Sequence, residues 1–291
     1  MKKIFPIFLM MFALACVSHV AQAQVDLPMT SPRASVEQRI GLTDVKITYH
    51  RPQVKGRVIY GGLEQYGKVW RTGANNATVI SFTDDVKING QPLPAGNYSL
   101  HTIPTQGEWT IIFNKVADQW GSYSYDEKQD ALRVKAQPIA ATPPQEILTF
   151  NFADVKSDRA TLEMSWSTLR VPFTIETEVT QKALRNSRDA VSKAKPDDWR
   201  TPFQAANYAY QSNVAPDEAM TWIDKSIAAK ESHTNLALKA RLLARAGKKA
   251  EAITLAEKAI KLGKAAQPAA DTAATEKFLV ELRSGATSAK N

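Results

Sequence analysis

The chain has 291 residues, of which 44 % are apolar and 23 % are charged. This composition is typical of a globular protein with a hydrophobic core, and it excludes a collagen-like or a largely disordered chain. The formal net charge of +8 is uneven: residues 24–180 hold 16 Lys and Arg against 17 Asp and Glu, whereas residues 181–291 hold 19 against 12. The basic surplus therefore belongs to the C-terminal part, where it predicts a solvated helical surface or contact with an acidic partner or an anionic membrane.

Residues 1–23 have the three parts of a secretory signal peptide. Lys2 and Lys3 supply the positive start, residues 4–17 the apolar run, and Ala21-Gln22-Ala23 the small-residue cleavage site. We expect an exported mature chain, periplasmic or secreted, that begins at Gln24. No later apolar run reaches the roughly 18 residues of a membrane span, so no transmembrane helix is predicted.

Cys16 leaves a second possibility open. It follows Ala13-Leu14-Ala15, which faintly resembles a lipoprotein cleavage site and would make the protein an outer-membrane lipoprotein. Cleavage after Ala23 instead removes the only cysteine. The mature chain then has no disulfide and no thiolate, a composition that suits an oxidising compartment.

Residues 24–177 have the pattern of a β-rich domain. Apolar side chains alternate with polar ones, as at Val45, Ile47 and Tyr49, and Asn89-Gly90 is a strong hairpin signal. About eight to ten short strands are expected between Gly, Pro and Asn turns. The fold class is therefore β followed by α, beginning with an antiparallel β-sandwich or jelly-roll-like domain.

Residues 178–285 have helical periodicity and an internal repeat. Ala219 and Ala252 are 33 residues apart, as are Trp222 and Leu255, and this resembles the tetratricopeptide period of about 34. A short tetratricopeptide-like domain is expected, with a plain helical bundle as the alternative. Residues 286–291 are expected to form a disordered tail.

Catalytic and metal-binding motifs are scarce. His50, His101 and His233 are the histidines after residue 23, and none lies in a zinc or nucleophile motif. Asp126, Glu127 and Asp130 lack the alternating oxygen ligands of a calcium loop. No metal and no cofactor is therefore predicted.

Two segments, residues 49–57 and 70–78, are rich in side chains that suit an anionic or a carbohydrate ligand. Arg presents a planar fork to carboxylate or phosphate, Trp a flat apolar face, and Asn both a donor and an acceptor. Loop ties made by the same side chains are the alternative. The candidate ligand-binding residues are Arg51, Arg57, Trp70, Arg71, Asn75 and His50.

Several motifs of this region, in order, resemble the bacterial domain-of-unknown-function 2911 family over residues 27–175. They include Tyr49-His50-Arg51-Pro52, Lys55-Gly56-Arg57, Trp70-Arg71-Thr72-Gly73-Ala74-Asn75 and Trp109-Thr110-Ile111-Ile112-Phe113-Asn114. The resemblance implies an exported β domain but no established activity, and His50 stands where the family is expected to have Ser.

The sequence favours a non-catalytic ligand- or protein-binding module of the cell envelope, with a protein partner at the helical repeats. An envelope hydrolase acting on sugars or peptides is the alternative, and it needs a carboxylate pair or a nucleophile with its base. Glu64, Glu108 and Glu163 are the carboxylates to inspect for that role. Nucleic acid is not expected as a partner, because export and the lack of a binding motif both argue against it.

Overall fold

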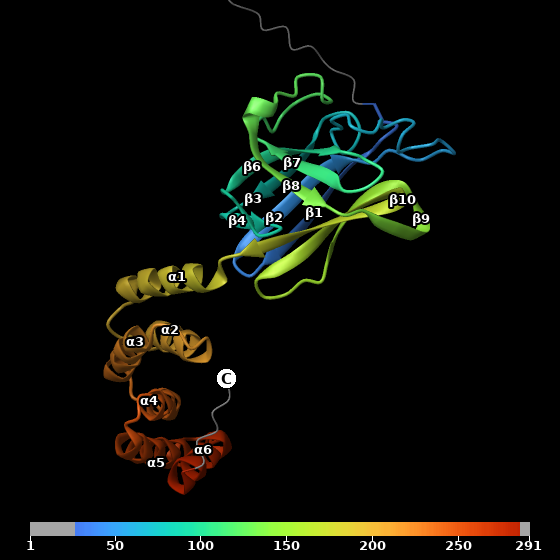
Figure 1. Ribbon diagram of the computed structural model, residues 1–291. Helices are drawn as coiled ribbons and strands as arrows, with labels where there is room; N and C mark the ends of the chain where they lie inside the picture. Colours follow the sequence, from blue (N-terminus) through green and yellow to red (C-terminus); the bar gives the residue numbers. More distant parts are fainter. Residues whose placement is uncertain (1–26, 286–291) are drawn as a thin grey trace, which may run out of the picture.

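In a computed structural model, residues 27–285 are described and form two antiparallel sheets followed by helices (Figure 1). One sheet has six strands in the order β1-β2-β3-β6-β7-β8, and the other has four in the order β5-β4-β10-β9. The first contains β1 (Arg33–Ile40), β2 (Thr43–His50), β3 (Thr78–Phe82), β6 (Gly96–Ile103), β7 (Trp109–Asn114) and β8 (Asp130–Ala136). The second contains β4 (Val86–Ile88), β5 (Gln91–Leu93), β9 (Ile139–Ala153) and β10 (Arg159–Thr177).

The two sheets share one hydrophobic core, which confirms the predicted sandwich. Ile47 and Tyr49 of β2 are buried, and Leu162 and Trp166 of β10 lie in the same cluster. Residues of one strand alternate between core and surface because successive side chains point to opposite faces. The predicted hairpin at Asn89-Gly90 joins β4 to β5, and both residues have the positive φ that such a two-residue turn requires.

The strand pattern ends at Thr177, and helix α1 (Val179–Lys193) follows directly. Five further helices are described: α2 (Arg200–Gln211), α3 (Pro216–Ala229), α4 (His233–Arg245), α5 (Lys249–Ala265) and α6 (Ala273–Ser284). Helix α2 packs on α3, and α4 packs on α5. Ala219 of α3 and Ala252 of α5, which the repeat aligns, are both fully buried. Small side chains at these positions let the paired helices approach closely.

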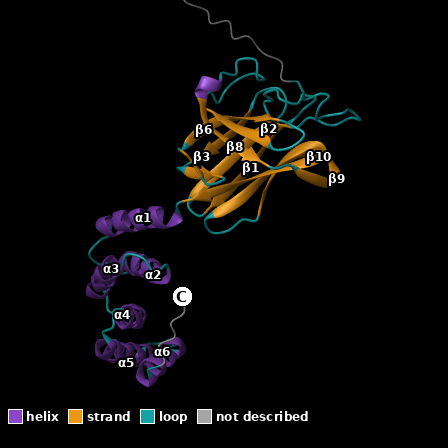
Figure 2. Cartoon of the chain, in the orientation of Figure 1, coloured by secondary structure: helices purple, strands orange, loops and turns teal. Residues whose placement is uncertain are grey.

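Helix α1 is attached to the sandwich by Lys182. Its Nζ donates to the Leu42 carbonyl at 2.6 Å and to the Asp84 carboxylate at 2.5 Å. The helices lie at one end of the sandwich, and the long loop between β2 and β3 lies at the other (Figures 1 and 2).

The predicted signal peptide, Cys16, the start at Gln24 and the tail after Gly285 lie outside the described residues. Within residues 27–285, no helix combines the length and the apolar character that a membrane crossing requires.

Candidate functional site

The loop of residues 51–77 joins β2 to β3 and contains most of the predicted ligand-binding residues. A loop of this length needs partners for its backbone groups. Arg51 supplies one tie: its Nε donates to the Leu148 carbonyl at 3.1 Å, and its Nη2 donates to the Thr149 hydroxyl at 2.9 Å. These bonds attach the start of the loop to β9, and Arg51 does not line the cavity described below.

Trp70 has a place in the core. It is 2 % exposed, its backbone pairs with Thr102 of β6, and its Nε1 donates to the Gly73 carbonyl at 3.1 Å. The ring therefore anchors the loop between the sheets, while the next residue, Arg71, is only partly buried.

Asn75 and His50 lie near the site without lining it. The Asn75 amide donates to the Ser31 carbonyl at 3.3 Å and so holds the N-terminal segment against the loop. His50 is 7 % exposed, and burial lowers its pKa, with further lowering from Arg33 and Arg71. The imidazole is therefore favoured in its neutral form beside two arginines.

The loop, the N-terminal segment and β10 line a partly open cavity of about 250 Å³. We call it the Arg71 cavity. Of the predicted ligand-binding residues, Arg57 and Arg71 line it; they come from opposite ends of the loop. The complete lining is Thr30, Ser31, Pro52, Gln53, Lys55, Arg57, Leu63, Glu64, Arg71, Gly73, Ala74 and Trp166.

Two N–H donors of these lining residues are buried without an acceptor. Arg71 Nε and Trp166 Nε1 have no hydrogen-bond partner among residues 27–285, although Trp166 is fully buried. Buried polar atoms are normally paired, and an unpaired donor costs about 1–3 kcal/mol. An arginine Nε and an indole Nε1 can only donate, so their missing partner must be an acceptor.

Glu64 brings a carboxyl group to the same cavity. Burial raises its pKa to about 7, and the positive charges of Arg71 and Arg57 offset part of that increase. No ion pair within 4 Å joins Glu64 to either arginine in the described part of the chain. The carboxyl is thus poised to change its protonation state near neutral pH.

Arg57 is exposed and bends back over its own loop. Its Nε donates to the Val54 carbonyl at 3.0 Å, and its Nη2 donates to the Gln53 carbonyl. Arg57 therefore both ties the loop and contributes positive charge to the cavity.

The other two candidate carboxylates for a hydrolase, Glu108 and Glu163, lie outside the Arg71 cavity, and each forms an ion pair. Glu108 lies 3.9 Å from Lys135, and Glu163 lies 3.4 Å from Arg170. Glu64 is the only Asp or Glu among the described residues that line the Arg71 cavity.

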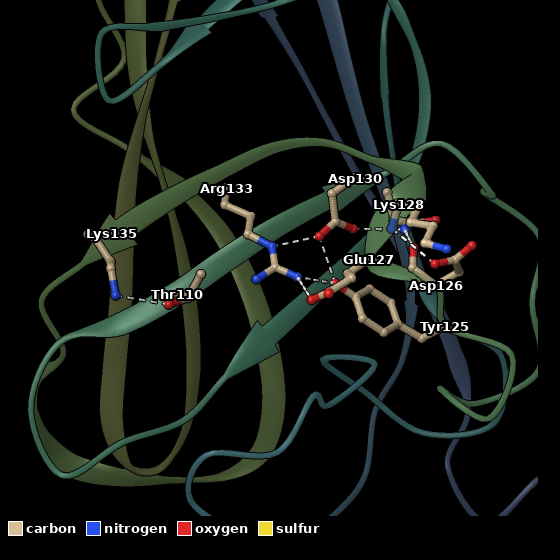
Figure 3. A network of polar contacts seen from close by, with 9 residues as sticks. Thr110, Tyr125, Asp126, Glu127, Lys128, Asp130, Arg133 and Lys135 are labelled. Atoms are coloured by element: carbon tan, nitrogen blue, oxygen red, sulfur yellow. Dashed lines mark hydrogen bonds and ion pairs between the residues drawn. The ribbon is translucent and has the colours of Figure 1, made fainter.

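The acidic residues Asp126, Glu127 and Asp130 belong to a separate network at the start of β8 and in the turn before it (Figure 3). Arg133 Nε donates to Asp130 at 2.6 Å, and its Nη2 donates to the Tyr125 hydroxyl at 2.8 Å. Burial and the bond to Asp130 raise the pKa of Tyr125 to about 12. Arg133 thus pairs with both Asp130 and Glu127 within the network.

His101 is fully buried on β6, and neither ring nitrogen has a partner among residues 27–285. Burial lowers its pKa to about 4, although Asp130 acts in the opposite direction. Within the same residues, no three His, Cys, Asp or Glu side chains gather as a metal site would require.

Sequence reasoning did not identify Trp166 as a site residue. In the sequence, Leu162, Met164 and Trp166 alternate with polar residues, as in a strand with one buried face, and the Trp166 ring is buried. The unpaired Nε1 depends on what surrounds the ring, and period-two alternation carries no such information.

Comparison with models of protein families gives a match for the β domain. Residues 31–175 fit the family model described as "Protein of unknown function (DUF2911)", a range that covers both sheets up to Ile175 and the Arg71 cavity except Thr30. The helices lie outside that match, so their likeness to tetratricopeptide repeats stays a prediction. No curated protein matches the chain. The chain belongs, through its β domain, to the DUF2911 family.

Proposed function

We propose that the protein is a non-catalytic binding protein of the cell envelope, and that its β domain binds a small oxyanion in the Arg71 cavity. The observation that carries this proposal is the pair of buried donors, Arg71 Nε and Trp166 Nε1, that have no acceptor among residues 27–285. An oxyanion supplies acceptor oxygens for both donors and a negative charge for the guanidinium.

The balance of charge in the cavity also favours an anion. Lys55, Arg57 and Arg71 line it together with one carboxyl group, that of Glu64. With Glu64 ionised the lining still has a positive surplus, and with Glu64 protonated the surplus is larger. A bound carboxylate, sulfate or phosphate group reduces it.

The envelope location rests on the sequence of residues 1–23, and the helical region supports a role in protein contacts. Helix pairs that stack through small residues such as Ala219 and Ala252 build extended surfaces, which proteins of this architecture use to bind other proteins. The basic surplus of residues 181–291 favours an acidic partner.

A hydrolase is the second candidate, and Glu64 is the observation that favours it. A carboxyl group with a pKa of about 7 suits a general acid or base at neutral pH. The described cavity lining offers it no second carboxylate, and the hydroxyl groups there belong to Thr30 and Ser31. We rank this function lower because a general acid alone does not complete a hydrolytic site.

The test measures the binding of acetate and of sulfate to the full chain. Binding is detected by the shift in unfolding temperature and by NMR. We expect both anions to stabilise the protein, and we expect Arg71→Ala to abolish the effect. Arg39→Ala is the matched control, since Arg39 is an exposed arginine of β1 paired with Asp44 at 3.5 Å. Equal stabilisation of the wild type and Arg71→Ala would overturn the binding site. Turnover of a nitrophenyl glycoside or a peptide that is lost in Glu64→Gln would instead establish the hydrolase.

A further inference from the structure

We infer that the Arg71 cavity takes up its oxyanion together with one proton, which Glu64 holds while the anion is bound. This inference rests on the proposed function and adds to it the way in which the site is regulated. The step is an acid–base equilibrium: the Glu64 carboxylate accepts a proton from solvent as the anion enters.

The geometry places the protein's own carboxyl group in competition with the ligand. Glu64 lines the same cavity as Arg57 and Arg71, and no ion pair within 4 Å joins it to either arginine in residues 27–285. An anion that reaches the Arg71 and Trp166 donors must therefore share this small volume with the Glu64 carboxyl. Two negative charges in one poorly solvated site repel each other, and protonation of one removes the repulsion.

The other charged groups around Glu64 do not replace it in this role. Lys55, Arg57 and Arg71 are basic side chains of the cavity lining, so they attract a bound anion and do not repel it. Tyr60 lies beside Glu64, and burial followed by the nearby Glu64 charge raises its pKa, so its hydroxyl stays neutral. Tyr66, on the same loop, is exposed to solvent.

His50, on the neighbouring β2, and His101, on β6, are two further titratable groups near enough to Arg71 for its charge to affect them. Burial and nearby arginine charge lower the pKa of both imidazoles, which favours their neutral forms. By contrast, burial raises the pKa of Glu64 to about 7. Bound anion raises it further, so that only Glu64 exchanges a proton on binding in the neutral to alkaline range.

The experiment measures the affinity of the full chain for acetate and for sulfate between about pH 6.5 and about pH 8.5, where neither probe titrates. We expect the affinity to fall as pH rises above about 7, by at most about tenfold per pH unit for one coupled proton.

In Glu64→Gln the carboxyl is replaced by a neutral side chain of the same shape. We expect that variant to bind at high pH as tightly as the wild type does at low pH, without the slope. Stronger binding of acetate points to a carboxylate ligand, and stronger binding of sulfate to a tetrahedral oxyanion; either result supports the inference if the slope is present.

Glu108→Gln is the matched control, because Glu108 lies away from the cavity beside Lys135. It should keep the wild-type slope. A wild-type affinity independent of pH, or a slope that persists in Glu64→Gln, overturns the inference. If either result is found while Arg71→Ala still abolishes binding, the proposed function stands and the proton coupling alone fails. Failure of both probes to bind at the lowest pH overturns the two proposals together.

Discussion

The indole rings of Trp70 and Trp166 stack with their centroids 5.5 Å apart and their planes 26° from parallel. Trp70 belongs to the β2–β3 loop and Trp166 to β10 in the opposite sheet. The stack therefore fixes the loop that contains Arg71 against the strand that supplies the second unpaired donor. One contact in the core sets the relative position of two elements of the candidate site.

Replacing Trp70 should destabilise the fold. Trp70→Ala removes a ring that is 2 % exposed and breaks the stack, at an expected cost of about 3–5 kcal/mol in the free energy of unfolding. Trp70→Phe keeps an aromatic ring but loses the Nε1 bond to Gly73, and it should cost less. Urea denaturation measures both. Tyr123→Ala is the control, because that aromatic ring is 88 % exposed, and its removal should change stability little. Equal effects of Trp70→Ala and Tyr123→Ala would show that the loop does not depend on this anchor.

The sequence predicted the elements of the fold better than it predicted the site. Period-two alternation at Val45, Ile47 and Tyr49 located β2, and the Asn89-Gly90 turn located a hairpin, because these signals are local. The change to helices after Thr177 was readable for the same reason.

The site depends on contacts between distant parts of the chain. The sequence predicted the same ligand-binding role for Arg51, Arg57 and Arg71. In the structure, Arg51 bonds to β9, whereas Arg57 and Arg71 line the cavity. Trp70 and Arg71 are adjacent, so in an extended segment their side chains point to opposite faces, but this local relationship does not determine which strand supplies the second donor. Only the three-dimensional packing brings Trp166 and Glu64 to the same cavity.

An indole signal should report on ligand entry. Trp166 Nε1 is buried and has no acceptor among residues 27–285, so an oxyanion that bonds to it should shift its proton resonance downfield. The chain has six tryptophans, and Trp166→Phe identifies the signal by its loss. Titration with acetate or sulfate should move this resonance, whereas that of Trp120, which is 60 % exposed, should stay in place. An unmoved Trp166 resonance at saturating anion would remove Trp166 from the site.

The two parts of the chain should fold separately. The large core cluster draws its buried residues only from Ile40 to Ile175, and the helices have clusters of their own. A fragment of residues 24–177 should give a β-type circular dichroism spectrum and a cooperative thermal transition, and one of residues 178–285 a helical spectrum. The first fragment lacks Lys182, so it loses that bond to Asp84 and should melt somewhat below the full chain. An unfolded 24–177 fragment would contradict the two-domain interpretation.

The mass of the protein from the envelope should show how it is exported. Cleavage after Ala23 gives a chain that begins at Gln24, as the apolar run and the small-residue site indicate. Intact mass spectrometry distinguishes this chain from a diacylated form that begins at Cys16. Recovery of the lipidated form would place the protein on a membrane anchor, and recovery of the full 291 residues would refute the signal peptide.

Glu64 should make the stability of the ligand-free protein depend on pH. Its carboxyl has a pKa of about 7 in the folded state, above the usual value of about 4.3 in an unfolded chain. Between these values the folded state binds more protons than the unfolded state, so stability decreases as pH rises from about 4 to about 7. Above about pH 7 the ionised, partly buried carboxylate costs its full penalty, about 3–4 kcal/mol. Glu64→Gln removes the charge, and the variant should therefore be more stable than the wild type at about pH 8, with a smaller difference at about pH 5. Chemical denaturation at the two pH values measures this, with Glu108→Gln as the exposed control. A Glu64→Gln variant that is less stable than the wild type at about pH 8 would show that the carboxylate stabilises the empty site, and would contradict the raised pKa on which the argument depends.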